Sequence, residues 1–257
     1  MKLGCSSWTY NKVFRAGELT LDRWLEVCAD ELKLDGVEIC WCHFPDTGLD
    51  GLRHVKRKVH TLGLEMAAVD VDNTFNVTSD TEMTTQVERT KHWIDIAAFL
   101  GAPVLRVFYA GWGDLEQAKS VEADMLEASR KIAAYAEERG VTLACEDHGP
   151  LTRTSDEMKK ILEGVGSHWY RVCLDFGNFT DGLASYKAIA ALSAHTHTKM
   201  QWRDTEGNRN PVDFAKAIDI LKEAGYQNYV CIEQAPGDDP VADTPKLVEQ
   251  LRGLIAG

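Results

Sequence analysis

The sequence has little positive charge. It carries 28 Lys and Arg residues against 40 Asp and Glu residues, which gives a formal net charge of −12 at pH 7. A field of this sign repels the phosphate backbone of nucleic acids unless a basic stripe offsets it locally. The densest basic run, residues 53–58, has helical spacing, and we interpret it as a solvated helix face. We therefore expect no nucleic-acid partner.

The sequence also lacks any apolar run of about 18 residues, the length that a membrane-spanning helix needs. The opening residues 1–7 are too short and too polar for a signal peptide. We therefore expect no membrane partner.

No Cys-x-x-Cys pair occurs among the seven cysteines, and seven is an odd number. Five cysteines lie within short apolar runs: Cys5, Cys40, Cys145, Cys173 and Cys231. Buried free cysteines behave as small hydrophobic residues. The pattern favours a reducing compartment, the cytoplasm, over a disulfide-bonded secreted protein.

Short apolar runs alternate with longer amphipathic stretches along the whole chain. The eight apolar runs are 2–7, 36–40, 64–71, 103–109, 141–146, 170–175, 194–199 and 229–233. Apolar residues at helical spacing predict helices over 21–34, 81–100, 115–139, 212–224 and 240–256, with shorter ones at 155–164 and 186–192. A glycine follows several of these stretches, where a helix would stop: Gly63, Gly101, Gly140 and Gly225.

This strand–helix–glycine–strand rhythm is typical of βαβ units, which need right-handed crossovers. Several runs are continuously apolar, as expected for strands buried on both faces of a parallel sheet. Eight strands with eight helices favour a closed (β/α)8 TIM barrel over an open sheet. No linker or composition break divides the chain, so the sequence predicts one α/β domain over residues 1–257.

The last four apolar runs each end in, or carry near their end, a carboxylate or an imidazole. These residues are Glu146, Asp175, His197 and Glu233. In such barrels the active site is built at the carboxyl ends of the strands. A single acid at a strand end usually caps the next helix or faces water. Four in succession, each close to an apolar run, predict a shared site.

Three carboxylates that converge without compensation repel one another and raise each other's pKa values. A divalent cation removes that penalty. Three carboxylates and one imidazole suit Mn²⁺, Mg²⁺, Co²⁺ or Zn²⁺ without any thiolate. We expect one bound divalent metal, Mn²⁺ or Mg²⁺ before Co²⁺ or Zn²⁺.

Four motifs accompany these residues: Glu-Asp-His-Gly at 146–149, Leu-Asp-Phe-Gly-Asn at 174–178, His-Thr-His-Thr-Lys at 195–199 and Ile-Glu-Gln at 232–234. Together with the opening Leu-Gly-Cys-Ser-Ser, they resemble the xylose isomerase-like TIM-barrel family of sugar phosphate isomerases and epimerases. The resemblance covers nearly the whole chain. It implies that Glu146, Asp175, His197 and Glu233 hold the metal, and that Glu146 and Glu233 flank the substrate and move its proton.

The chemistry also follows from the residues. Isomerising or epimerising a sugar requires removal of a weakly acidic proton beside a carbonyl, and a metal stabilises the enediolate that forms. Two carboxylates on opposite sides then serve as base and acid. Glu146 and Glu233 come from strands three steps apart around the barrel, so we expect them across the site from each other.

Other polar residues near the same strand ends are candidate substrate contacts. His148 could hold a substrate hydroxyl or orient Glu146, and Asn178 could bind substrate or cap a helix. Lys199 lies one layer further out than His197, and Arg203 follows in the next loop as a candidate anion contact.

Aromatic residues follow several strands: Trp8, Trp41, His43, Trp112 and Trp202. Flat aromatic faces can cover the C–H faces of a sugar, or they can simply pack over the barrel mouth. We expect Trp8 and Trp112 among the substrate contacts.

Three residues are expected behind the site. By strand alternation His195 points the same way as His197, one layer deeper, and is either a supporting partner or a satisfied core histidine. Arg106 lies inside a strand, and a buried guanidinium needs a partner. Glu38 in the second strand is the expected partner.

The third strand departs from the family pattern, because many members place a histidine after it. Here the segment 69–76 contains no histidine, and Asp70, Asp72 and Asn73 are the candidates to replace it. The family includes isomerases, epimerases, dehydratases and lyases, so the resemblance alone does not select the reaction.

The leading interpretation is a metal-dependent sugar isomerase or epimerase of carbohydrate metabolism, with a small-molecule carbohydrate substrate. The alternative is a lyase or dehydratase that acts on a sugar, cyclitol or keto-glycoside at the same site. A DNA-repair nuclease on the same barrel would need many more histidine ligands, and this chain has only eight histidines. Its negative net charge is also wrong for DNA. A non-catalytic sugar sensor would not need a paired glutamate set. A homo-oligomer is the common default.

Overall fold

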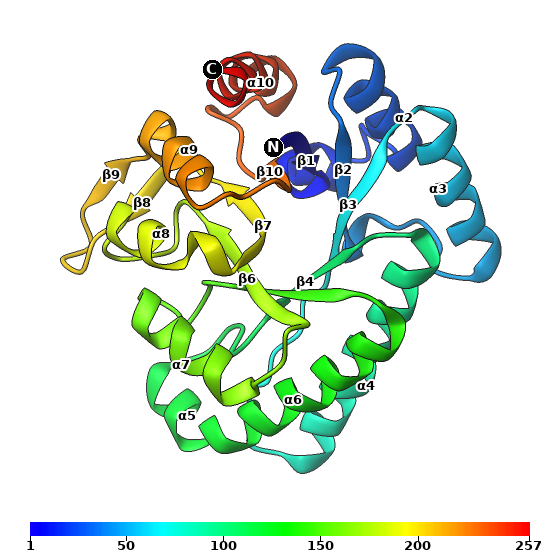
Figure 1. The fold of residues 1–257 in the computed structure, drawn as a ribbon. Coiled ribbons are helices and arrows are strands. Elements are labelled where there is room, and N and C mark those ends of the chain that lie inside the picture. The colour runs from blue at the N-terminus through cyan, green and yellow to red at the C-terminus, as the bar shows by residue number, and fades with distance from the viewer.

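The computed structural model describes residues 1–257, and eight parallel strands close into a barrel in the order β1-β10-β7-β6-β5-β4-β3-β2 (Figure 1). The barrel strands are β1 (Lys2–Ser6), β2 (Gly36–Cys40), β3 (Glu65–Asp70), β4 (Val104–Phe108), β5 (Thr142–Glu146), β6 (Tyr170–Asp175), β7 (Ser193–Thr198) and β10 (Tyr229–Ile232). Strands that follow one another in the chain are neighbours in space. The predicted TIM barrel is therefore confirmed.

Helices surround the barrel and cover its outer face (Figure 1). They are α1 (Asn11–Arg15), α2 (Leu21–Glu26), α3 (Leu49–Thr61), α4 (Asp80–Leu100), α5 (Leu115–Ser120), α6 (Glu122–Arg139), α7 (Ser155–Val165), α8 (Leu183–Ile189), α9 (Phe214–Glu223) and α10 (Pro240–Ala256). Short helical turns add η1 (Ser7–Tyr10), η2 (Val27–Glu31), η3 (Trp41–His43) and η4 (Ala190–Leu192). None of these helices is both long enough and apolar enough to cross a membrane.

Two of the longer predicted helices are divided. The stretch expected as one helix over 115–139 breaks at Val121, whose φ of −118° and ψ of 15° are not helical. The stretch expected over 21–34 continues from α2 into the π-helical turn η2 and stops at Leu32. In both places the apolar periodicity continues across the irregularity, so the pattern alone does not reveal it.

The loop after β7 contains an antiparallel hairpin that the sequence analysis missed. It pairs β8 (Gln201–Arg203) with β9 (Arg209–Pro211). The turn between them is built by Asp204, whose side chain accepts hydrogen bonds from the backbone N–H groups of Glu206 and Asn208 at 3.0 and 2.8 Å. Strands of three residues are too short to show an alternating pattern.

Gly101 and Gly140 end α4 and α6 as predicted. Their φ values of 83° and 68° lie in the left-handed region, which costs a glycine little because it has no side chain. Each glycine N–H donates back to the last turn of its helix, at Ala97 and Ala98 for Gly101. The chain can therefore turn at once into the next strand.

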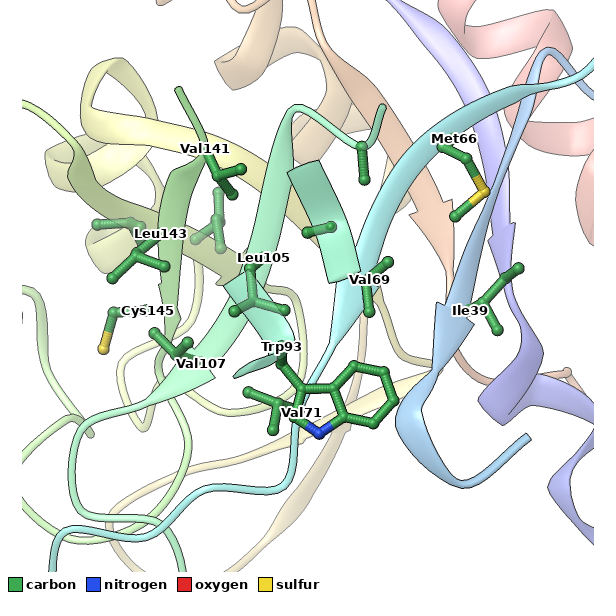
Figure 2. Close-up of a cluster of buried hydrophobic side chains, with 14 of the residues drawn as sticks. Ile39, Met66, Val69, Val71, Trp93, Leu105, Val107, Val141, Leu143 and Cys145 are labelled. Carbon is green, nitrogen blue, oxygen red and sulfur yellow. The ribbon is translucent and has the colours of Figure 1, made fainter. Parts of the chain in front are cut away.

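The main core lies between the outer face of the barrel and the helices. Figure 2 shows part of it, where Val69 and Leu105 lie near Trp93 of α4 and Leu143 lies one strand further along. Val69 pairs with Leu105, and Leu105 with Leu143, so the strand register aligns these side chains in one layer. Strand alternation then turns the residue after Leu105, Arg106, into the barrel.

The barrel interior has a different composition. A separate buried cluster of small residues is made of Ala68, Val104, Ala144, Cys173 and Ala194. Further toward the carboxyl ends, the inward positions are polar, among them Glu38, Asp70, Arg106 and His195. Small side chains leave room for these groups, and so the fold places a buried ionic network directly beneath the strand ends.

Candidate metal centre

Four polar side chains meet at the carboxyl ends of β5, β6, β7 and β10. Glu146 and Asp175 are the last residues of their strands, His197 pairs with Asp175 across the sheet, and Glu233 directly follows β10. One potential ligand atom from each of the four lies within 4.8 Å of the others. All four residues are buried, with exposed fractions between 0% and 8%. The structure therefore brings together the four residues that the sequence analysis selected.

The ammonium group of Lys199 lies among the three carboxylates. Its Nζ forms an ion pair with Asp175, lies 2.8 Å from Glu233 Oε2 and lies 3.6 Å from Glu146 Oε1. Three buried carboxylates would repel one another without a positive charge, and Lys199 supplies one. Lys199 was expected as a substrate contact one layer further out, whereas the structure places its ammonium group inside the carboxylate cluster.

The donor atoms fit a divalent cation. His197 Nδ1 is buried and has no hydrogen-bond partner, whereas the buried Glu146 Oε2 and Glu233 Oε2 face the cations of Arg106 and Lys199, at 3.2 and 2.8 Å. His197 Nδ1 lies 3.4 Å from Glu233 Oε1 and 3.7 Å from Glu146 Oε2, so this ring nitrogen faces both carboxylates. A buried polar atom without a partner is costly, and coordination would satisfy His197 Nδ1. A cation bound here and the Lys199 ammonium would compete for the same oxygens.

Glu38 fixes the orientation of the His197 ring. His197 Nε2 lies 3.0 Å from both carboxylate oxygens of Glu38, and His195 Nε2 lies 2.6 Å from Glu38 Oε2. Burial raises the pKa of Glu38, but His197 and His195 outweigh it and hold the pKa well below its usual range. An ionised Glu38 accepts the Nε2–H of His197. Burial lowers the pKa of His197, but Cys173, Glu38 and Glu233 outweigh it and hold that pKa well above its usual range, so Nδ1 would bind a metal once the ring gives up its second proton.

Arg106 does not pair with Glu38, so that prediction was wrong. Its Nη2 lies 3.2 Å from Asp70 Oδ2, its Nε lies 3.2 Å from Glu146 Oε2, and its Nη1 donates to the carbonyl of Val71 at 3.1 Å. Asp70 is the register partner of Arg106 on the adjacent strand, whereas Glu38 is one strand further away and is held by the two histidines. Arg106 therefore links Asp70 to Glu146.

The surrounding charges decide the protonation of the carboxyl groups. Burial raises the pKa of Glu146, but Lys199, Arg106 and His197 together hold that pKa below its usual range. Burial raises the pKa of Asp175 to about 7, although Lys199 opposes it. In the absence of a metal, Glu146 is thus ionised at neutral pH while Asp175 is partly protonated.

A further buried carboxyl, Asp147, was not selected from the sequence. Its Oδ1 accepts the backbone N–H of Asp175 at 2.8 Å, which ties the end of β5 to the end of β6. Burial and the nearby Asp175 hold the pKa of Asp147 well above its usual range. Its position between Glu146 and His148 at a strand end was the available signal.

Asn178, and not His148, contacts Glu146. Asn178 Nδ2 donates a hydrogen bond to Glu146 Oε1 at 3.0 Å. The His148 ring lies between Phe108 and Trp112, at centroid distances of 4.9 and 4.6 Å. Burial lowers the pKa of His148, which favours the neutral imidazole at neutral pH. Of the two roles expected for His148, the structure leaves the contact with substrate open and gives the orientation of Glu146 to Asn178.

A cavity of about 320 Å³ opens beside the carboxylates, and both Glu146 and Glu233 line it. Three tryptophans, Trp8, Trp41 and Trp112, form part of its wall. Trp8 and Trp112 are 40% and 66% exposed, which is unusual for side chains of this size. The volume lies at the lower end of ligand pockets, roughly 300–1,000 Å³. A larger hollow of about 650 Å³, lined by Phe14 and His54 among others, contains none of the four cluster residues.

Four of the residues considered near the substrate do not line this cavity: Asn178, Arg203, Trp202 and His43. Asn178 lines an adjacent hollow. Arg203 lies on β8, its guanidinium donates to the carbonyl of Gly207 at 3.4 Å, and it lines an adjacent hollow instead. Trp202 packs closely against Gly182. The His43 ring stacks on Phe14 at 4.2 Å, beneath the surface.

The segment after β3 contributes one residue to the cavity. Asp70 is held by Arg106, and Asn73 exchanges two hydrogen bonds of 2.9 Å with the backbone of Phe108. Only Asp72 of the three expected candidates lines the cavity. It is therefore the residue of this segment that is placed to contact a ligand.

A family model described as xylose isomerase-like TIM barrel matches residues 27–254 of the chain. Among solved structures, D-allulose 3-epimerase from Methylomonas sp. in complex with D-allulose superposes with a TM-score of 0.80 at 17% identity, covering 98% of this chain and 96% of that one. D-psicose 3-epimerase from Clostridium cellulolyticum H10 with D-tagatose gives 0.77 at 16% identity, covering 100% and 97%. The probable 3-DHS dehydratase AsbF from Bacillus anthracis gives 0.75 at 14% identity, covering 100% and 99%.

One curated protein also matches in sequence. A segment of 172 residues is 29% identical to part of the trigger factor of Azorhizobium caulinodans. The match covers 57% of this chain and spans only 35% of the length of that protein. With this identity and coverage, it does not assign the chain to the family of that protein.

Proposed function

The chain belongs to the xylose isomerase-like TIM barrel family, and on this premise we propose that it is a divalent-metal-dependent sugar epimerase or isomerase. The observation that carries the proposal is the placement of Glu146 and Glu233. Both line one cavity, and they lie at the carboxyl ends of strands three steps apart around the barrel. A small carbohydrate in this cavity would have a carboxylate available on each side.

Glu146, Asp175, His197 and Glu233 are the proposed metal ligands. A divalent cation held by them would polarise the substrate carbonyl and stabilise negative charge on the enediolate oxygens. Mn²⁺ and Mg²⁺ suit the oxygen-rich donor set best, and Co²⁺ and Zn²⁺ are compatible with it.

Glu146 and Glu233 are the proposed acid and base. One carboxylate takes the proton from the carbon beside the carbonyl, and the other carboxyl returns a proton to the opposite face or to the adjacent carbon. Asn178 holds Glu146 through one oxygen and Arg106 lies near the other, which limits the rotation of this carboxylate. The wall tryptophans, Trp8 and Trp112 among them, would cover the C–H face of the sugar and exclude water.

A dehydratase on a related hydroxy-carbonyl compound is the second candidate. The same enediolate can expel a β-hydroxyl group if a nearby acid protonates it. Lys199 and His148 both line the cavity, and Lys199 carries a proton that it could donate. The similarity in fold to AsbF is compatible with this reaction.

The experiment is a substrate screen in D₂O with added Mn²⁺ or Mg²⁺. Ketoses, aldoses and hydroxy-carbonyl acids are incubated with the purified protein and analysed by NMR. An epimerase or isomerase incorporates deuterium beside the carbonyl, and its product keeps all the carbon and oxygen atoms of the substrate. A dehydratase releases water from the substrate. The proposal would be contradicted if the protein, supplied with metal, catalysed neither reaction on any of these substrates.

A further inference from the structure

Two cysteines lie together at the mouth of the cavity. Cys40 is the last residue of β2, and Cys42 lies in the turn η3 that follows. Their sulfur atoms are 3.4 Å apart, and both residues line the same cavity as Glu146. Cys40 is 2% exposed, whereas Cys42 is open to solvent. The other five cysteines are all buried.

We propose that Cys40 and Cys42 form a reversible disulfide in the presence of a peroxide, and that this disulfide suppresses activity at the neighbouring cavity. The effect on activity rests on the proposed function, whereas formation of the disulfide does not. A disulfide needs an S–S distance of about 2.05 Å, so the two sulfurs need to approach by only about 1.4 Å.

The chemistry balances with hydrogen peroxide as the oxidant. The Cys42 thiolate attacks one peroxide oxygen, the O–O bond breaks, and a sulfenic acid and water result once the released hydroxide takes a proton. The Cys40 sulfur then attacks the sulfenic sulfur, and the departing hydroxide takes the Cys40 proton to form a second water. Two thiols are oxidised to one disulfide while one peroxide is reduced to two waters. A dithiol reductant reverses the change.

The environment suits this order of steps. Cys42 is the sulfur that a peroxide can reach, and Cys40 lies directly behind it as the resolving thiol. The hydrogen bond from Cys40 and the nearby His43 lower the pKa of Cys42 despite its partial burial. A thiolate at neutral pH is the form that reacts with peroxides.

The turn that carries the two cysteines is connected to the carboxylate cluster. The backbone N–H of Trp41, between the two cysteines, donates to Asp70 Oδ1 at 3.1 Å. Asp70 pairs with Arg106, which in turn lies 3.2 Å from Glu146. Joining the sulfurs closes a small ring that contains Trp41 and must rotate its peptide group. The rotation would disturb the hydrogen bond to Asp70 and move Trp41 in the cavity wall.

A soft metal ion is the competing occupant of this pair, because His43 lies within reach of both sulfurs. Both nitrogens of the His43 ring are already engaged, however. Nδ1 lies 2.8 Å from Ser7 Oγ and Nε2 lies 3.2 Å from Asn11 Oδ1. The ring would have to give up these contacts to bind a metal, so the disulfide is favoured.

The test treats the full-length protein with hydrogen peroxide, blocks the remaining thiols with an alkylating agent and analyses the peptides by mass spectrometry. We expect a peptide that has lost two hydrogens and resists alkylation at Cys40 and Cys42, and recovery of both thiols with dithiothreitol. Cys40→Ser and Cys42→Ser should each abolish the cross-link, and the matched control Cys28→Ala should retain it. Sulfinic acid at Cys42 without a cross-link would overturn the proposal, as would stoichiometric Zn²⁺ that protects both thiols.

Turnover of an identified substrate tests whether the disulfide suppresses activity. A shift of about 1 Å in a catalytic arrangement can cost on the order of 100-fold in rate. We therefore expect oxidation to lower kcat/KM by about tenfold or more in the wild type and in Cys28→Ala, and reduction to restore it. The ratio of oxidised to reduced activity should stay near one in Cys42→Ser. A cross-linked protein with unchanged turnover would contradict the regulatory role. A cross-link in a protein that has no sugar activity at all would instead count against the proposed function.

Discussion

Glu38 holds His197 by one ring nitrogen and thereby directs the other toward the carboxylates. Nε2 of His197 lies 3.0 Å from both Glu38 oxygens, and Nδ1 lies 3.4 Å from Glu233 on the opposite edge of the ring. All three residues are buried, so solvent weakens these contacts little. The orientation of the imidazole is therefore built into the barrel before any ligand arrives.

Replacing Glu38 with Gln should weaken metal binding without removing a ligand. The amide is neutral and a poorer acceptor for the Nε2–H, and loss of such an outer partner typically costs about 10–100-fold in metal affinity. Isothermal titration with Mn²⁺ measures the change. Glu65→Gln, which alters an exposed carboxylate on β3, is the control and should leave the affinity unchanged. Equal affinities for Glu38→Gln and wild type would show that Glu38 does not orient His197.

Lys199→Met should destabilise the metal-free protein and increase the stabilisation against thermal unfolding that Mn²⁺ provides. The substitution leaves Asp175 and Glu233 without their counter-charge, and breaking a buried ion pair costs about 3–5 kcal/mol. Added Mn²⁺ should restore the loss, because it no longer competes with an ammonium group. Thermal unfolding with and without Mn²⁺ measures both effects. The same metal-induced shift in wild type and variant would refute the competition, and Lys187→Met on α8 controls for loss of a lysine.

Metal affinity should rise with pH through about pH 7 and continue to rise above it, because the pKa of His197 is held well above its usual range and this ring must also lose a proton to bind a metal. The metal-free Asp175 has a pKa raised to about 7, so below that pH its carboxyl carries a proton that must leave when a metal binds. Each unit of pH below the pKa should then cost up to about tenfold in apparent affinity. Titrations in buffers with different ionisation enthalpies detect the released proton. A flat profile below pH 7 would mean that Asp175 does not ligate the metal.

Glu146→Gln and Glu233→Gln should each abolish turnover, because each removes one of the two proton-transfer groups. Losses of about 100-fold to 10,000-fold are usual for such groups, larger than for any neighbouring residue. Asp72→Asn is the comparison, since Asp72 lines the cavity without belonging to the carboxylate cluster. Deuterium exchange on the identified substrate measures the rates. If the Glu233→Gln variant retained its metal and its full rate, the two-carboxylate mechanism would be ruled out.

Much of the architecture could be predicted from the sequence. The eight barrel strands agree with the apolar runs to within two residues at each end, because buried parallel strands and amphipathic helices leave distinct patterns. The position of Glu146, Asp175 and Glu233 followed from the same logic, since each comes directly at a strand end. The break at Val121 and the hairpin after β7 left no such pattern.

The partners of the charged residues could not be predicted in the same way. Glu38 and Arg106 both point into the barrel, but which groups they meet depends on the register between strands and on the distance across the interior. A long side chain can also extend in several directions from its backbone position. Lys199 therefore reaches the carboxylates instead of the outer rim. Periodicity places a residue on a face, and only the closed barrel decides its neighbours.

The central claim is that side chains from β5, β6, β7 and β10 share one cation, and Mn²⁺ binding followed by pulsed EPR tests it most directly. We predict one Mn²⁺ per chain with the signature of one directly bonded imidazole nitrogen, which His197→Ala removes and His195→Ala preserves. Absence of stoichiometric binding would contradict the account. So would a bound ion whose nitrogen signal persists in His197→Ala.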